Sequence, residues 1–177
     1  MKNSRPNSQT VLFILATFLI AAAAQAVYYY PQLPDKIPSH ITVTGEVDDY
    51  MVKSTFFIRM LSAIFGTAFF LSLGSLLVLT KAPQLVNLPH KEYWFAPERK
   101  QETIAFVFMI NLKLTIATTL MMMAIFQSII WVGIGSPVSP AIVIWTSTGL
   151  LCAYFLLIII KLNRRFKLPE AAQETPT

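Results

Sequence analysis

Four long apolar runs take up most of this chain, and they restrict it to a fold that crosses a membrane. A transmembrane helix needs about 20 consecutive, mostly apolar residues, and a helix pairs its own backbone polar groups inside lipid. Hydrophobic residues make up 55% of the 177 residues and charged residues only 13%, against about 25% charged in soluble domains. We therefore predict an all-α membrane protein with spans at residues 11–30, 56–79, 104–134 and 141–160.

The positions of the basic residues predict how these spans are oriented. Lysine and arginine accumulate in cytoplasmic segments next to the span ends. Residues 1–10, 80–103 and 161–177 hold most of the 14 basic residues, whereas residues 31–55 hold four acids and two lysines. We predict a four-transmembrane-helix bundle with both termini and residues 80–103 in the cytoplasm. Residues 31–55 then form a short, shaped extracytoplasmic loop.

The first apolar run also resembles a secretory signal peptide, because Ala24 and Ala26 imitate a small-residue cleavage site. The run continues beyond Ala26 into Tyr28, Tyr29 and Tyr30, and a tyrosine cluster is typical of a membrane interface. We therefore expect an uncleaved span. Cleavage would leave three spans and an N-terminus outside the cell.

Composition and motifs exclude several functions. The net charge of +5 does not indicate a nucleic-acid partner, because the basic residues lie at span ends, where they face lipid headgroups. The single cysteine, Cys152, excludes an intrachain disulfide and a Cys-x-x-Cys metal site. Walker, Gly-x-Ser-x-Gly and His-Glu-x-x-His motifs are missing from the sequence. We predict a non-enzymatic protein without a cofactor, whose partners are membrane lipids and a protein or peptide.

The predicted outer loop has the pattern of a folded segment. Its prolines, including Pro34 and Pro38, favour extended backbone at the residues before them. Residues 41–43, Ile-Thr-Val, favour a strand, and the following Thr-Gly at residues 44–45 favours a turn. We predict an extended arm and a turn lying over the helix ends, with Asp48 and Asp49 capping a local turn.

His40 is the one histidine in this loop, and three roles are open to it. With Glu46, Asp48 and Asp49 it offers zinc ligands, but the spacing resembles no tight ligand motif, and we predict no metal site. We favour a structural role in which His40 is held by hydrogen bonds, with Asp48 as the partner. Titration of His40 near neutral pH leaves pH sensing as an alternative.

The predicted cytoplasmic loop combines aromatic and basic residues. Tyr93, Trp94 and Phe95 lie close to Lys91 and Arg99. This combination is typical of a segment that lies on a membrane surface, with aromatic rings at headgroup depth and cations against anionic lipid. A docking surface for a partner protein is the functional alternative.

Asn111 and Lys113 are the most unusual residues inside an apolar run. A cation within the membrane is costly and suggests function, but we favour a Lys113 side chain that extends to the cytoplasmic headgroups. The alternative places Lys113 inside the bundle, paired with Asn111 or with a loop acid. We expect Gln25 and Gln127 to face other helices.

Small residues predict how the first two spans pack. Ser62, Gly66 and Gly74 recur at multiples of four and share a helix face, and residues 21–24 are all alanine. Small faces let helices approach closely, so we expect the two antiparallel spans to pack through them. The alternative is that glycine and alanine are simply common in membrane helices.

Both loops carry a family pattern. Residues 33–40 match Leu-Pro-x-x-Ile-Pro-x-His, residues 45–48 match Gly-x-x-Asp, and a Lys-Ser pair follows at residues 53–54. Residues 87–94 are similar to Asn-x-Pro-Asn-Lys-x-Tyr-Trp. The chain thereby resembles small bacterial membrane proteins that carry domain of unknown function 1648, among them the SdpI toxin-immunity proteins. The site residues that the resemblance implies are Pro34, Ile37, Pro38, His40, Gly45, Asp48 and Lys53 outside, and Asn87, Pro89, Lys91, Tyr93 and Trp94 inside.

The resemblance implies a multi-pass protein of the bacterial cytoplasmic (inner) membrane with a role in immunity or signalling. It would sense or neutralise an extracytoplasmic agent through the outer loop. Ile41 and Thr42 depart from the pattern, because many relatives have an aromatic residue and an asparagine there, and SdpI-type proteins have more spans. Two alternatives stay open: a small transporter or accessory subunit that uses Asn111 and Lys113, and a membrane enzyme that uses His40 and its neighbouring acids.

Overall fold

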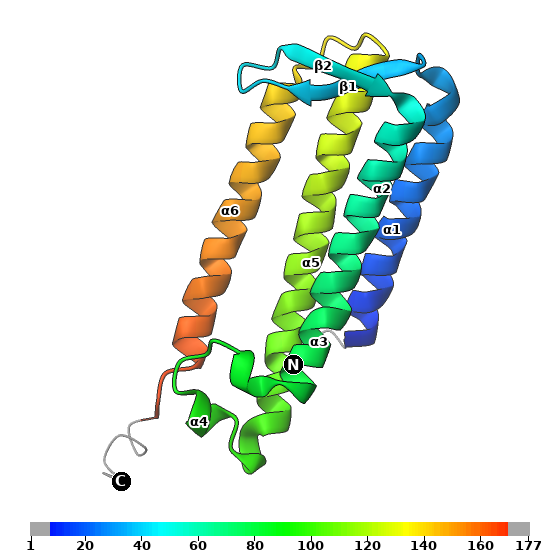
Figure 1. Cartoon of the computed structure of the whole chain (residues 1–177). Coiled ribbons are helices and arrows are strands. Elements are labelled where there is room, and N and C mark those ends of the chain that lie inside the picture. Colours follow the sequence, from blue (N-terminus) through cyan, green and yellow to red (C-terminus); the bar gives the residue numbers. More distant parts are fainter. Residues whose placement is uncertain (1–7, 170–177) are drawn as a thin grey trace, which may run out of the picture.

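The computed structural model describes residues 8–169, which form four long helical segments side by side with a β-hairpin across one end (Figure 1). The elements in chain order are α1 (Ser8–Tyr29), a 3₁₀ turn (Tyr30–Gln32), β1 (Lys36–Ile41), β2 (Val47–Val52), α2 (Lys53–Phe69), a π turn (Phe70–Gly74), α3 (Ser75–Lys81), a 3₁₀ turn (Pro83–Leu85), α4 (Lys91–Trp94), α5 (Pro97–Gly133) and α6 (Pro140–Arg165). We call the two ends the hairpin end, with β1 and β2, and the tail end, with α4 and the last turn of α6 (Figure 1).

Each predicted span corresponds to one long helical segment. Among the described residues, four segments are long and apolar enough to cross a membrane, which indicates a membrane protein. Residues 1–7 and 170–177, which belong to the predicted tip and tail, lie outside the described part of the chain. The four segments are Ser8–Gln32, Lys53–Lys81, Pro97–Gly133 and Pro140–Arg165.

The last two helices extend beyond the predicted apolar runs. α5 begins at Pro97, with Glu98 in its first turn, because proline suits the first helical position and an acid suits the positive end of the helix dipole. α6 continues to Arg165, with basic residues in its last turn, where cations stabilise the helix dipole. Part of the predicted cytoplasmic loop and part of the predicted tail are therefore helical.

The second span is interrupted by a π turn between α2 and α3. Such turns interrupt the regular i→i+4 ladder of backbone hydrogen bonds. Here Asn111 of α5 donates its side-chain amide to the carbonyl of Leu71 and to the hydroxyl of Ser75, the latter at 2.8 Å. The interruption therefore coincides with a polar contact between the second and third spans.

The main apolar core lies at the hairpin end, where α1, α2, α5 and β1 meet. Ile37, Phe126 and Ile64 are completely buried, and the ring of Phe57 meets the ring of Phe126 edge to face, with centroids 5.3 Å apart. Between membrane-spanning helices such side chains stabilise the bundle through van der Waals packing and not through transfer from water. The remaining buried members of this cluster are Ala22, Ala26, Leu33, Phe56, Ile129 and Ile130.

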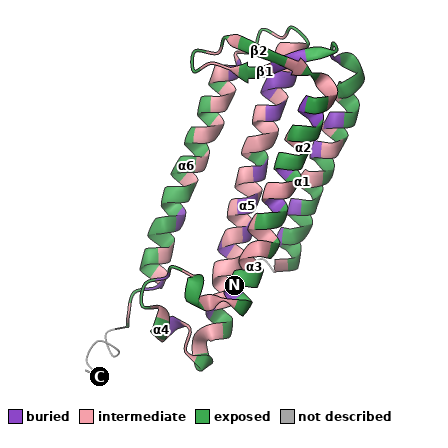
Figure 2. Ribbon diagram, in the orientation of Figure 1, coloured by how far each residue is buried: buried purple, intermediate pink, exposed green. Residues whose placement is uncertain are grey.

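α6 is the most exposed of the four long helices (Figure 2). Of its described residues, Pro140 and Ile158 alone are buried. Along its length it packs against α5, and at its two ends it contacts the hairpin and the α4 segment. α6 is thus held by one helix and by two end contacts.

The predicted packing of small faces between the first two spans is wrong. A Cβ atom built on Gly66 or Gly74 would meet no atom within 4 Å, and Ser62 is exposed. α1 packs mainly along α5 instead, with Ala22 and Ala26 in the core. α1 and α2, which follow each other along the chain, therefore pack less closely than α1 and α5 do.

Candidate functional site

The predicted outer loop is a two-stranded antiparallel hairpin, which we call the hairpin cap (residues 36–52). Lys36 lies opposite Val52 in the register, and the pairing is irregular between Pro38 and His40, as expected because proline donates no backbone hydrogen bond. The predicted strand at residues 41–43 is displaced, since β1 already ends at Ile41. The next residues instead form the turn that precedes β2.

Backbone hydrogen bonds and one glycine shape the tip of the hairpin cap. The amide of Thr42 donates to the carbonyl of Glu46 at 2.8 Å, and the amide of Gly45 donates to the carbonyl of Thr42 at 2.9 Å. Gly45 has a φ of +94°, which glycine adopts without steric cost. The predicted turn at residues 44–45 is present.

The tip of the hairpin cap rests on the first turns of α6. A Cβ atom at Gly45 would lie 3.1 Å from Cβ of Ala141, so the two backbones approach closely. One turn further along α6, the indole nitrogen of Trp145 donates to the carbonyl of Val43 at 3.3 Å. The hairpin cap therefore connects the α1–α2 side of the bundle to α6 (Figure 1).

The base of the hairpin cap is anchored in the core. Ile37 is completely buried and Pro38 is buried beside it in sequence. Lys53 donates its ammonium to the carbonyl of Leu33 at 2.9 Å and lies 3.6 Å from the carboxylate of Asp35. These contacts give Ile37, Pro38 and Lys53 structural roles at the junction of hairpin and helices.

Polar side chains form two pairs on the outer surface of the hairpin cap. Nδ1 of His40 lies 2.6 Å from a carboxylate oxygen of Asp48, with the two side chains 66% and 48% exposed. The hydroxyl of Ser39 donates to Asp49 at 2.8 Å. The expected contact between His40 and Asp48 is present, whereas both acids lie in β2 and cap no turn.

The carboxyl group of Asp49 is shifted in its pKa. The hydrogen bond from Ser39, then that from the backbone of Tyr50, and the charge of His40 lower the pKa of Asp49, because each favours the charged form. Among the described residues, no three His, Cys, Asp or Glu side chains gather as a metal site. The outer surface of the hairpin cap thus carries two pairs of polar side chains, His40 with Asp48 and Ser39 with Asp49.

The predicted cytoplasmic motif lies at the tail end, where Trp94 packs into an aromatic cluster. Trp94 is buried, and its indole nitrogen donates to the carbonyl of Phe166 at 3.1 Å. Thr103 donates its hydroxyl to the carbonyl of Trp94 at 2.8 Å. We call Trp94, Phe106 and Phe166 the tail cluster; their rings meet edge to face at Phe166. Trp94 thus faces the bundle, and the prediction that it lies on a membrane surface is wrong.

Basic residues surround the tail cluster. The guanidinium of Arg165 lies 4.8 Å from the centre of the Trp94 ring and forms an ion pair of 2.7 Å with Glu102. The guanidinium of Arg99 lies 3.9 Å from the centre of the Tyr93 ring. These contacts connect α4, α5 and α6.

The rest of the tail-end motif is a turn with few side-chain contacts. Asn87 and Pro89 are exposed, and His90 adopts a left-handed conformation with φ of 51°. Lys91 donates its ammonium to the carbonyl of Gln84 at 2.9 Å. The motif therefore combines a folded turn with the anchoring Trp94.

The intramembrane polar residues divide between two locations. Asn111 bonds to the π turn and to Ser75, as described above, whereas Lys113 lies in a groove lined by α1, α5 and α6. The amide of Gln25 donates to the side-chain carbonyl of Gln127 at 2.7 Å, so both glutamines face another helix as expected. Asn111 and Lys113 do not form one site.

Comparison with known proteins gives one positive result. Residues 12–66 match the protein family described as Domain of unknown function (DUF1648). The match covers most of α1, the hairpin cap and most of α2, which is less than half of the 177 residues. No curated protein and no solved structure matches the chain. The matched segment thus includes the outer motif of this chain, with His40, Gly45 and Asp48.

Three contact residues were missed by the sequence analysis. Trp145 lies in an apolar run and Thr103 borders one, where neither looks unusual. For Phe166 a usable signal is present in the sequence, because it is the one aromatic residue among Arg164, Arg165 and Lys167 in the basic tail. An isolated ring among cations is a position where cation–π contacts form.

Proposed function

We propose that this protein is a non-enzymatic, multi-pass protein of the bacterial cytoplasmic (inner) membrane that detects or neutralises an extracytoplasmic agent. The hairpin cap would be the recognition surface and α6 the connection to the cytoplasm. One observation carries the proposal: α6 contacts the tip of the hairpin cap with its first turns and the tail cluster with its last residues.

The chemistry of the hairpin cap supports a cationic, amphipathic agent such as a membrane-active peptide. Asp48 and Asp49 are exposed and carry the negative charge. Val43 and Tyr50 expose 75% and 58% of their surface nearby in the hairpin, and exposed aromatic residues are common binding anchors. A basic peptide with apolar side chains would complement both features.

The one-sided attachment of α6 supports a role in relay. Few of its residues are buried and it packs along α5, so α5 is the helix past which a displacement at the hairpin tip would move it. At the far end, the same helix holds Arg165 against Trp94 and Glu102. A shift of α6 would thereby change how α4 is held, and α4 would pass the change to a cytoplasmic partner.

Deletion of the gene tests the proposal. Cells without the protein should become more sensitive to cationic membrane-active peptides, and the wild-type gene should restore resistance. The double variant Asp48→Asn with Asp49→Asn should not restore it, whereas Glu92→Gln, which removes an exposed acid at the tail end, should. Unchanged sensitivity across a broad peptide panel, together with unchanged transcription, would rule out this function.

A second experiment separates relay from recognition. Ala141→Leu places bulk against the hairpin tip without changing the tip itself, and Ala153→Leu is the control at an exposed position of α6. We expect Ala141→Leu to keep peptide binding and lose protection, and Ala153→Leu to keep both. Full protection by a folded Ala141→Leu protein would remove α6 from the mechanism.

A small transporter or accessory subunit is the second candidate. It is supported by Lys113, a cation inside an apolar run that lines a groove between helices. This function expects Lys113→Met to abolish a flux or an assembly phenotype. Unchanged folding, flux and assembly in that variant would leave the candidate without support.

A further inference from the structure

We propose that the groove between α1, α5 and α6 binds one anionic phospholipid, with its phosphate at Lys113 and Lys161 and an acyl chain along the apolar part. The site lies away from the hairpin cap and does not depend on the function proposed above.

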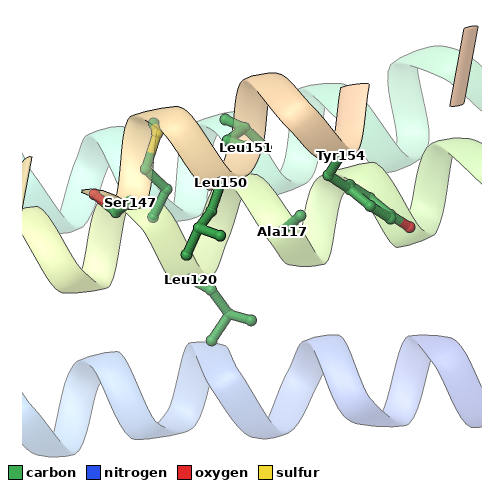
Figure 3. Close-up of a pocket in the computed structure, with 7 residues that line it drawn as sticks. Ala117, Leu120, Ser147, Leu150, Leu151 and Tyr154 are labelled. Carbon is green, nitrogen blue, oxygen red and sulfur yellow. The ribbon is translucent and has the colours of Figure 1, made fainter. Parts of the chain in front are cut away.

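The groove is a series of hollows that share lining residues. A hollow of about 310 Å³ lies between α5 and α6, and Figure 3 shows Leu150 and Tyr154 of α6 beside Ala117 and Leu120 of α5. A second, of about 410 Å³, shares Ala117, Leu120 and Tyr154 and reaches α1. The hollows therefore form one apolar groove along the helices, and this groove is open to the surrounding lipid.

Towards the tail end, the residues that line the groove include several cations. Lys113 lines the second hollow and also a third, of about 120 Å³, together with Tyr154 and Lys161. The next hollow along α6 contains Lys161 and Arg164. Over a rise of 1.5 Å per residue, Lys113 lies about 10 Å from Leu120 along α5. One end of the groove thus carries positive charge and the other is apolar, which is the polarity of a phospholipid.

Two cations of this groove, Lys113 and Lys161, lack a counter-charge within the described chain. Across residues 8–169, Lys113 forms no hydrogen bond or ion pair. No acid lines the two hollows that include Lys113 or the hollow between α5 and α6. Lys161 has only the face of Phe106, 5.9 Å away. By contrast, Lys53, Lys91 and Arg165 each bond to a carbonyl or a carboxylate.

An anionic phospholipid fits this arrangement better than other anions. A cation within a membrane segment is costly unless it meets an opposite charge or water, and a phosphodiester supplies the charge at headgroup depth. Free phosphate would leave the apolar part of the groove unfilled. The groove is also open sideways to lipid, so a phospholipid can enter it without crossing water. Tyr154 lies between the two lysines and the apolar part, where its hydroxyl can reach the headgroup region.

Lipid binding to the purified protein tests the site. The protein is placed in nanodiscs of mixed phosphatidylglycerol and phosphatidylcholine, and the lipid retained after extraction into detergent is measured by native mass spectrometry. We expect one phosphatidylglycerol retained per chain by the wild type. Lys113→Met or Lys161→Met should lower the preference for phosphatidylglycerol about fivefold, the effect of one cation at an anionic surface.

Two further variants separate charge from shape and from misfolding. Ala117→Phe fills the apolar hollow and should lower retention while leaving both lysines in place, and Lys113→Arg should keep the preference if Lys113→Met fails to fold. Lys36→Met, an exposed lysine on β1, is the control and should bind as the wild type does. Equal retention of the two lipids by the wild type, or displacement of the lipid by inorganic phosphate alone, would overturn the proposal.

Discussion

The two ends of the bundle are held together in different ways. At the hairpin end, the chain folds on itself over residues 36–52, and neighbouring residues satisfy one another through backbone hydrogen bonds. At the tail end, Trp94 contacts Phe166 through its side chain. Two long helices, α5 and α6, separate these two residues along the chain. The first end is a local structure, and the second exists only once α5 and α6 have packed.

The two ends also differ in how their charged side chains are placed. The hairpin cap exposes acids such as Asp48 and Asp49, whereas Arg99 and Arg165 stack on aromatic rings at the tail end. Exposed charges leave a surface free to bind, and cations stacked on rings stabilise a fold. We therefore expect mutations at the tail end to change stability and mutations on the hairpin surface to change binding.

Trp94→Ala should have the largest effect on stability. It removes the central ring of the tail cluster, and truncation of a buried tryptophan costs about 3–5 kcal/mol. Thermal unfolding in detergent should show a large loss, with hydrogen exchange in the hairpin cap unchanged. Trp145→Ala is the matched control, because Trp145 is 56% exposed. A loss as large for Trp145→Ala would contradict the difference between the two ends.

Gly133→Ala should have the next largest effect, at the hairpin end. A Cβ atom there would lie 2.5 Å from a methyl carbon of Leu33, so the buried side chain of Leu33 must shift within the core, at a cost of about 1–3 kcal/mol. Gly149→Ala in α6 has open space and should be neutral or stabilising, as alanine favours helix. Chemical denaturation of both variants makes the comparison; equal stabilities would show that Leu33 moves aside freely.

Glu102→Gln should have a small effect that depends on salt. It breaks the ion pair with Arg165, whose side chains are 67% and 32% exposed, and such pairs contribute about 0.2–1 kcal/mol. The stability difference from the wild type should shrink as salt is raised, because salt screens exposed charges. A difference that persists at high salt would mean that the pair holds the tail cluster by geometry and not by charge.

The pH dependence of Asp49 should be the smallest effect. Its pKa is lowered in the folded protein, first by the hydrogen bond from Ser39, so its contribution to stability is present above about pH 4 and is lost as pH falls through the lowered pKa. An NMR titration of the carboxyl carbon should show a midpoint below that of the Ser39→Ala variant. Coincident midpoints would show that Ser39 does not hold the carboxylate.

The sequence predicted the features that depend on neighbouring residues. The four spans follow from the apolar runs, and the turn at residues 44–45 follows from glycine. The predicted contact of His40 with Asp48 is present, because the hairpin brings these residues together. Family resemblance pointed to the same segment, and the match to residues 12–66 covers it.

Features that depend on helix packing were not predictable from one sequence. The glycine face of the second span looked like a packing surface, yet nothing approaches Gly66 or Gly74, because α1 pairs with α5, which is not its neighbour along the chain. Trp94 lies in a segment whose composition is typical of a membrane surface. It faces the bundle because its indole nitrogen bonds to Phe166, which follows α6. Hydropathy defines which segments are helical without defining which of them touch.

The π turn at Phe70–Gly74 has a consequence for how this protein tolerates changes in length. A π turn accommodates one more residue than an α turn while the helix continues beyond it. Deletion of the exposed Leu73 should therefore convert the second span into a continuous α-helix. The same face of α3 should then still pack against the bundle. A deletion of one residue from α5 would rotate everything beyond it by about 100°. Among the described residues, the π turn is thus a place where the bundle can lose a residue without turning the helix beyond it.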